Sequence, residues 1–156
     1  MKKKIIRFIF DTYLSFIKGS VGSKSYQHDY YFINGKKLDV LENGNLSCAF
    51  YVSSVLAVFN LISITHTTVK STVVNMESSG WKKIKKPRLG CVLVWESKQF
   101  ADGAHRHIGF YTGSEKAISN NDKKLFPIEH HWTFGVVKGK PKRKVEAMYW
   151  HPNLEK

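Results

Sequence analysis

Cysteine is scarce in this sequence, and its scarcity excludes two classes of small protein. The 156 residues include two cysteines, Cys48 and Cys91. Two thiols cannot form the disulfide framework of a small secreted domain, and their spacing matches no zinc-binding pattern. A single bridge between them is an alternative that would consume both thiols.

Several motifs of common enzyme classes are missing as well. The sequence has no GxGxxG or GxxxxGK[ST] phosphate loop, no GxSxG nucleophile turn, and no HExxH or CxxC metal motif. Histidines occur in pairs at positions 105 and 107 and at positions 130 and 131, but a zinc site needs three or four ligands at defined spacing. We therefore expect no metal and no cofactor.

Acidic residues are outnumbered, with 12 Asp and Glu against 25 Lys and Arg, which gives a formal net charge of +13. Such a surface attracts polyanions, whether nucleic acid, anionic lipid or an acidic cell-wall polymer, and the charge alone does not choose among them. No RNA- or DNA-binding signature is readable, so we expect no obligate nucleic-acid partner. We interpret the two basic stretches, residues 82–86 and 138–144, as solvated loops.

No uninterrupted apolar segment marks a signal peptide or a transmembrane helix. Arg7 and Asp11 break the apolar run at the amino terminus, and no small-residue cleavage site follows. Residues 1–20 instead predict a docking helix with one broad apolar face, a signal anchor being the alternative. Residues 46–64 are diluted by serines and Asn60, so we expect a soluble core helix and no transmembrane segment. The location is left open between the cytoplasm and release by a non-standard route.

What the sequence does have is the composition of one globular domain. Hydrophobic residues make up 42% and aromatic residues 13% of the 156 residues, which is enough for a real core without room for a second module. Helical patterns precede strand patterns along the chain, and this order is typical of an α+β fold with helices packed on an antiparallel sheet. We predict a single domain over residues 1–156, and a monomer.

Local patterns predict the individual elements. Asn34 and Gly35 predict a hairpin turn between two short strands. The longest apolar run, residues 46–62, predicts a buried helix, and a second helix is predicted over residues 67–78, with Gly80 as its stop signal. In the second half the period changes to that of strands, which we predict at residues 91–96, 107–112, 116–119, 130–137 and 145–150.

Cys48 lies at the head of the 46–62 run, shortly after the turn residues ENGN. A cap at Asn45 or Ser47 places Cys48 in the first helical turn, where free backbone N–H groups and the helix dipole favour a thiolate. Such a thiol becomes a nucleophile when an imidazole reaches it. The alternative is a buried cysteine that only fills space.

The stretch HRHIGFYTG carries the candidate base. On a strand, His107 shares one face with Gly109 and Tyr111, and Gly109 leaves open space beside the imidazole. The helix that carries Cys48 is expected to pack on the sheet, so the thiol and the imidazole could meet. His107 is therefore the predicted general base, and the alternative is a surface histidine held by a hydrogen bond.

A third polar group should hold the other ring nitrogen of His107 and fix its tautomer. The segment at the end of the next strand carries Ser119, Asn120 and Asn121. We choose Asn120, because its amide oxygen accepts the imidazole N–H without adding a charge. Ser119 and Asn121 stay open as alternatives, as does a plain turn formed by Ser-Asn-Asn-Asp.

Three stretches together resemble a known family: SCAFYVSS at a helix start, SSGWKKIKKPRLGCVLVWE, and HRHIGFYTGSEKAISN. They are similar to the NlpC-like papain-fold cysteine peptidases and the related amidases over residues 43–121. The resemblance implies a papain-like fold with the catalytic cysteine at Cys48 and its base at His107, acting on peptides of the bacterial cell wall. The sequence departs from the family at Cys91, where Asp is usual, and near Ser119, where the family's third histidine falls.

We therefore expect a cysteine hydrolase that cleaves an amide or peptide bond through a thioester intermediate. One alternative is an inactive scaffold of the same fold that binds polyanions through its lysines. A second is an acyltransferase that moves the acyl group to an amine. A third is a membrane-surface protein that uses residues 1–18. His130 and Trp132 either line the substrate cleft or only cap a strand.

Overall fold

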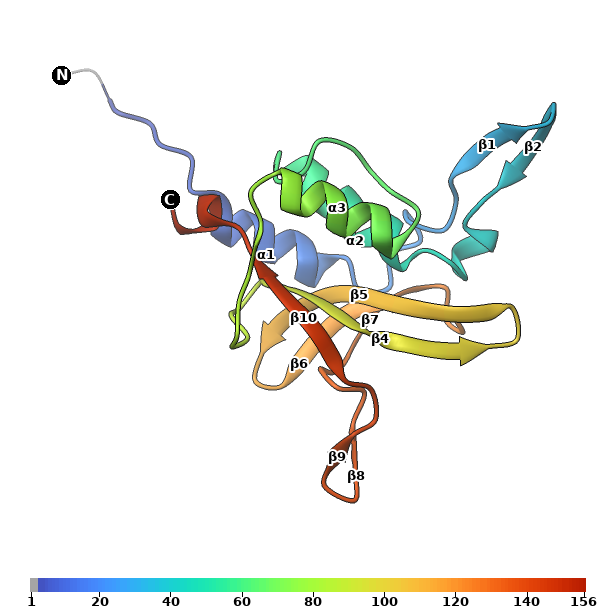
Figure 1. Cartoon of the computed structure of the whole chain (residues 1–156). Helices are drawn as coiled ribbons and strands as arrows, with labels where there is room; N and C mark the ends of the chain where they lie inside the picture. The colour runs from blue at the N-terminus through green and yellow to red at the C-terminus, as the bar shows by residue number, and fades with distance from the viewer. Residues whose placement is uncertain (1–2) are drawn as a thin grey trace.

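Three helices form a layer on one face of a six-stranded antiparallel sheet (Figure 1). The computed structural model describes residues 3–156. Its helices are α1 (Ile9–Gly19), α2 (Cys48–Val58) and α3 (Val69–Ser78). This arrangement confirms the predicted α+β class, with amino-terminal helices packed on an antiparallel sheet.

The sheet has the strand order β3-β10-β4-β5-β6-β7, and every neighbouring pair is antiparallel. The last strand of the chain therefore inserts between β3 and β4, and β4 and β5 form the central pair. The bounds of the strands are β3 Lys82–Lys83, β4 Val92–Phe100, β5 Gly103–Gly113, β6 Lys116–Asn121, β7 Phe126–His131 and β10 Val145–Trp150.

Two small hairpins stand outside this sheet. One pairs β1 (Tyr30–Ile33) with β2 (Lys36–Asp39), and the other pairs β8 (Val136–Val137) with β9 (Lys140–Pro141). Figure 1 shows them on opposite sides of the molecule, β1–β2 on the side of the helices and β8–β9 below the sheet. Two 3₁₀ turns complete the structure, η1 (Glu42–Gly44) and η2 (Pro152–Glu155).

Side chains alternate between the two faces of the sheet, and each face packs against a different part of the molecule. On one face, the ring of Phe110 lies 5.6 Å from that of Tyr51 on α2. On the other face, the rings of Trp95 and His107 lie 5.4 Å apart. Both faces of β4 are covered, because Val92–Trp95 are at most 2% exposed. The continuous apolar run at the start of this strand predicts such burial.

The amino-terminal helix is shorter than predicted. α1 begins at Ile9, and residues 3–8 have no regular structure; residues 1 and 2 of the predicted helix lie outside the described part. A helix gains most of its stability from a packed apolar face, and α1 buries Tyr13, Leu14 and Ile17. The apolar residues ahead of it do not reach the core and are exposed: Ile5, Ile6 and Phe8.

Other boundaries differ where turns interrupt a pattern. The strand predicted at residues 130–137 is wrong, because β7 ends at His131 and positive φ angles at Phe134 and Gly135 turn the chain before β8. The plain turn that we left open after residue 119 is also wrong, because β6 extends to Asn121. In the helical half, α2 ends at Val58, short of the predicted 62.

Within residues 3–156, no helix has both the length and the apolar character needed to cross a bilayer.

Candidate active site

Cys48 is the first residue of α2, as predicted. Ser47 takes the N-cap position, and its carbonyl accepts the N–H of Tyr51 at 2.8 Å. The Ser47 hydroxyl makes no capping bond, and it is buried without a partner in the described part of the chain. Within residues 3–156, the backbone N–H groups of residues 48–50 have no oxygen acceptor, although that of Ala49 approaches the Cys48 sulfur. These free donors are those that a developing oxyanion would need.

The thiol of Cys48 is half-buried and lies against the backbone of β5. Burial raises its pKa to about 11, although the backbone N–H groups of Ile108 and Ala49 and the charge of Arg143 act in the opposite direction. The thiol is therefore protonated at neutral pH. The thiolate that we predicted from the helix position alone is outweighed by desolvation.

The pairing between two strands, β5 and β6, ends near this thiol. β5 and β6 are paired from Gly113 and Lys116 as far as Phe110 and Ile118, and no pairing follows beyond them. The N–H of Tyr111 donates to the carbonyl of Cys91, directly ahead of β4, so by alternation the N–H of Ile108 points toward β6. The Cys48 thiol therefore lies beside the N–H of Ile108, one residue from His107.

His107 belongs to a chain of hydrogen bonds across three strands. Its Nε2 lies 2.8 Å from Ser119 Oγ, which lies 2.7 Å from Nε2 of His130. The Nδ1 of His130 lies 2.7 Å from the carbonyl oxygen of His131. The chain thus connects β5, β6 and β7 on the face of the sheet opposite the helices.

The direction of these bonds follows from the last acceptor. A carbonyl can only accept, so Nδ1 of His130 donates to His131. Burial lowers the pKa of His130, so its ring is neutral and its Nε2 accepts the proton of Ser119. The Ser119 oxygen then accepts the N–H of His107 Nε2. Nδ1 of His107 is left as the ring nitrogen with a free lone pair, which is the form a general base requires.

An aromatic wall surrounds both imidazoles. The ring of Trp95 lies 5.4 Å from that of His107, and Phe134 stacks on His130 at 4.2 Å. The indole N–H of Trp95 donates to the carbonyl of Trp132 at 2.7 Å, and this bond fixes the position of the Trp95 ring. Burial, the charge of Arg143 and the neighbouring His130 lower the pKa of His107 to about 3. His107 is therefore neutral in water at pH 7.

Arg143 is the residue that our sequence reasoning missed. It lies in the basic stretch 138–144 that we interpreted as a solvated loop, yet it is only 7% exposed. Its guanidinium donates to the carbonyls of Glu96 and His105 at 3.0 and 2.9 Å, and no carboxylate pairs with it within residues 3–156. Its charge favours the thiolate of Cys48 and disfavours protonation of His107. Nothing in the sequence distinguishes this arginine from the lysines around it.

The structure brings Ser119, and not Asn120, to His107. Asn120 points to the helical face, where its Nδ2 donates to the carbonyl of Gly44 at 2.8 Å. Its Oδ1 is buried without a partner in the described residues. Asn121 caps the following turn by accepting two backbone N–H groups. Neighbouring strand residues point to opposite faces, so the register that brings Ser119 to the imidazole turns Asn120 away from it.

Cys48 and His107 do not form a hydrogen-bonded pair, although the thiol approaches the N–H of Ile108, the neighbour of His107. No hydrogen bond within residues 3–156 joins the thiol to either ring nitrogen. Cys48 belongs to α2 on the helical side of the sheet, whereas the imidazole packs against Trp95 on the other face. Cys48 and Cys91 are both free, so the alternative disulfide is absent. No cluster of three or more potential metal ligands occurs among the described residues.

Comparisons of this chain with protein-family models, with curated proteins and with solved structures found no match.

Proposed function

We propose that this protein is a papain-like, NlpC-type cysteine hydrolase that cleaves an amide bond, with Cys48 as nucleophile and His107 as base. The observation that carries the proposal is the directed chain from His131 through His130 and Ser119, which leaves Nδ1 of His107 unprotonated. That base lies one residue from Ile108, whose N–H meets the Cys48 thiol. A thiol at a helix start beside an imidazole on a packed strand is the arrangement used in cysteine acyl transfer.

The raised pKa of Cys48 and the lowered pKa of His107 define the resting state as a neutral pair. In the reaction, Nδ1 of His107 takes the thiol proton while sulfur forms a bond to the carbonyl carbon. The carbonyl π electrons move to oxygen, and the free N–H groups at the head of α2 receive the negative charge. His107 then gives its proton to the amide nitrogen, the oxyanion electrons re-form the carbonyl, and the C–N bond breaks, which releases the amine and leaves a thioester.

Water completes the cycle on the same groups. His107 removes a proton from water while the water oxygen attacks the thioester carbon. The C–S bond then breaks to release the acid, and His107 returns the proton to the sulfur, which restores the neutral pair. Because the two side chains are not in contact in this conformation, the proposed reaction requires the thiol and the imidazole to approach each other when substrate binds. Catalytic contacts that are long without substrate and close in its complex are common.

The proposed substrate is a peptide of the bacterial cell wall, as the family resemblance implies. The net charge of +13 supports this choice, because it concentrates the protein on an acidic polymer. Hydrolysis is chosen over transfer to an amine because nothing in the structure favours an amine acceptor. Added amines that appear in the product would assign the acyltransferase instead.

The test is the release of new amino groups from purified peptidoglycan. We expect Cys48→Ala to lower the rate by more than about a thousandfold, while Cys91→Ala keeps most of the activity. The second thiol is the matched control because it is free, buried and outside the proposed chemistry. Unchanged release by the Cys48→Ala variant would remove Cys48 from the mechanism.

A second candidate is an inactive scaffold of the same fold that binds polyanions. It is favoured by the missing contact between Cys48 and His107 and by the protonated thiol. It requires that no thioester forms with any cell-wall peptide and that binding to the polymer is equal for the wild type and Cys48→Ala. Trapping of an acyl group on Cys48, seen as an added mass on that residue, would exclude it.

A further inference from the structure

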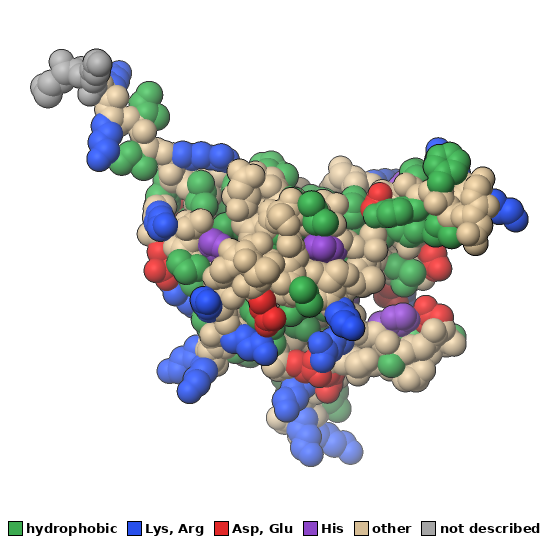
Figure 2. Space-filling model, turned by 45° about the horizontal axis from the view of Figure 1, so that its top comes forward, with side chains coloured by type: hydrophobic (Ala, Val, Ile, Leu, Met, Phe, Trp, Pro, Cys, Tyr) green, Lys and Arg blue, Asp and Glu red, His purple; other side chains and the backbone are tan. Residues whose placement is uncertain are grey.

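The β1–β2 hairpin, residues 30–39, carries a cluster of apolar side chains in solvent. Its two strands pair only with each other. Phe32 is 80% exposed, and four more apolar residues of this aromatic hairpin are 44% to 55% exposed: Tyr30, Tyr31, Ile33 and Leu38. Figure 2 shows the cluster projecting from the body with lysines beside it. Single exposed apolar residues need no explanation, but a contiguous group marks an interaction surface.

The aromatic hairpin is held at both ends. At its base, the carboxylate of Asp39 accepts three backbone N–H groups and pairs with the ring of His28 at 2.7 Å. At its tip, Asn34 and Gly35 take φ angles of 51° and 75°, as a two-residue turn requires. A two-stranded hairpin is marginally stable in water by itself. These contacts therefore maintain a preformed apolar surface that the core does not use.

Both faces of the aromatic hairpin are apolar. Its register pairs Tyr31 with Leu38 and Phe32 with Lys37. Because neighbours along a strand alternate, the apolar residues divide between the faces, with Tyr31, Ile33 and Leu38 on one and Tyr30 and Phe32 on the other. A flat protein surface covers one face of such a hairpin and leaves the other in water. The interface of a bilayer surrounds a hairpin and covers both faces.

The lysines of the hairpin suit the same environment. Lys36 and Lys37 follow the turn, and the ammonium of Lys37 lies 4.6 Å from the centre of the Tyr30 ring. Lysine buries its alkyl stem among apolar groups and keeps its charge at the polar boundary. Aromatic and aliphatic side chains next to lysines are the composition of surfaces that enter anionic headgroups.

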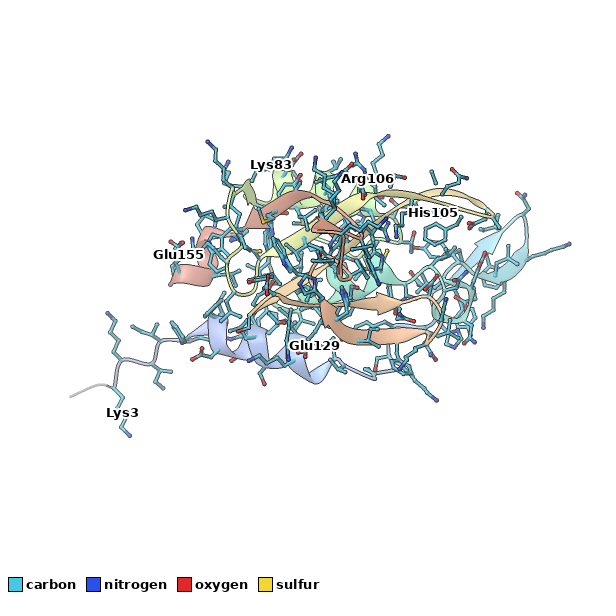
Figure 3. All side chains as sticks on the ribbon, turned by 90° about the horizontal axis from the view of Figure 1, so that it is seen from below. Lys3, Lys83, His105, Arg106, Glu129 and Glu155 are labelled. Carbon is cyan, nitrogen blue, oxygen red and sulfur yellow. The ribbon has the colours of Figure 1, made fainter. Side chains whose placement is uncertain are left out.

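A second group of apolar and cationic side chains lies on the same side of the molecule. Figure 1 shows residues 3–8 and the aromatic hairpin both rising from the helical side, and Figure 3 shows Lys3 well away from the folded body. Ile5 is 90% and Ile6 is 70% exposed. The segment has no acidic residue, and its cations are Lys3, Lys4 and Arg7. Four residues of the helical half are also apolar and exposed: Phe16, Val58, Ile64 and Val74.

We propose that the helical side of this protein docks on an anionic lipid bilayer. The aromatic hairpin enters the boundary between headgroups and acyl chains, and residues 3–8 form a second contact. Lysines attract the anionic lipid, and burial of the apolar side chains adds to the binding free energy. The β8–β9 hairpin is also basic but faces the other way (Figure 1), so charge alone does not define the docking side. This docking is independent of the chemistry at Cys48.

The test uses the full chain and vesicles that contain equal amounts of phosphatidylglycerol and phosphatidylcholine. We expect binding in co-sedimentation, and we expect Tyr31→Ser combined with Phe32→Ser to weaken it by about tenfold or more. The matched control is Val136→Ser with Val137→Ser, which removes apolar side chains 58% and 51% exposed from β8–β9. This control should bind as the wild type does. Vesicles of phosphatidylcholine alone should bind more weakly.

A second readout follows the hairpin itself. Phe32→Trp should shift its fluorescence to shorter wavelength when phosphatidylglycerol vesicles are added, because the indole leaves water. No binding to these vesicles, an equal loss in the valine control, or binding that the hairpin variant leaves unchanged would each overturn the proposal. Binding of a single-stranded DNA oligonucleotide through the hairpin, without binding to vesicles, would overturn it in favour of a nucleic-acid surface.

Discussion

Ser119 is the residue on which the protonation state of the proposed base depends. Its oxygen accepts from Nε2 of His107 and its proton goes to His130. Ser119→Ala removes both bonds. The ring of His107 is then no longer held in place, and its proton can move from Nε2 to Nδ1, which leaves fewer molecules with Nδ1 free to act as base. We expect the rate of amide cleavage to fall by about 10- to 100-fold, below the roughly 10²- to 10⁴-fold that a general base itself contributes.

The control for this prediction is Asn121→Ala. Asn121 is the neighbouring candidate on β6, and it only accepts backbone N–H groups of the following turn. Its loss should leave the rate within a factor of about two, as a surface substitution does. The pH profile of the rate should change in Ser119→Ala and not in Asn121→Ala. Equal profiles in the two variants would make the bond to His107 incidental.

Arg143 acts on both members of the proposed pair through its charge. Arg143→Gln should raise the pKa of His107, because a nearby positive charge disfavours the imidazolium, and should also raise the pKa of Cys48, because the same charge favours the thiolate. Ring proton signals in NMR and the pH dependence of alkylation at Cys48 report the two pKa values. The variant also leaves two buried carbonyls short of a donor, which costs about 1–3 kcal/mol of stability. Opposite movement of either pKa would contradict the assigned role.

Among the elements, the contact between β5 and β6 is set by Gly109. A Cβ built there would lie 2.7 Å from the Cβ of Ser119, 2.7 Å from the carbonyl of Ile118 and 3.0 Å from the ring of Trp95. Gly109→Ala must therefore separate the two strands and move Ser119 away from His107. We expect a loss of about 1–3 kcal/mol in stability, measured by urea unfolding, together with a loss of amide cleavage.

A matched substitution separates this effect from the general effect of replacing glycine. A Cβ at Gly19, in the last turn of α1, meets no atom within 4 Å. Gly19→Ala should leave the free energy of unfolding unchanged or slightly higher, because it reduces the freedom of the unfolded chain. If Gly109→Ala is tolerated equally well, the close approach of β5 and β6 is not required.

Gly109 also illustrates how far the sequence determines the site. The strand pattern identified the face that His107 shares with Gly109, but we read the glycine as open space beside the imidazole. In the structure, Ser119 and Trp95 fill that space. Which of Ser119 and Asn120 reaches His107 depends on the register of β5 against β6, and a shift of one residue exchanges the faces. Short-range patterns contain no information on that register.

Elements with local signals were predicted well, and those that depend on distant contacts were not. Asn34 and Gly35 specify their own turn through positive φ angles, and β10 has the predicted bounds 145–150. β7 was missed because its residues 126–131 pair with β6 along a half-exposed edge and include Pro127. Burial of Arg143 required contacts with two strands more than 35 residues away in sequence.

At the scale of the whole molecule, the neutral buried histidines make stability depend on pH. The pKa of His107 falls from 6.5 to about 3 on folding, so between these values the unfolded chain binds a proton that the folded chain does not. The free energy of unfolding therefore rises as the pH increases from about 3 to 6.5. Above about 6.5, the neutral ring of His107 no longer makes stability depend on pH. Lowering the pH from 7 to 4 should cost on the order of 1–3 kcal/mol, seen in urea unfolding.

Two variants assign this slope to its source. His107→Gln lacks the titrating ring, so its stability should change less between pH 7 and pH 4 than that of the wild type. Asp39 also has a lowered pKa, of about 2 against 3.8, because hydrogen bonds from His28 and from backbone N–H groups outweigh its burial. Its contribution is lost only below about pH 4, so Asp39→Asn should leave the slope between pH 7 and pH 4 unchanged. If His107→Gln keeps the full slope, the imidazole is not buried in its neutral form, and the uncharged resting pair proposed for catalysis fails with it.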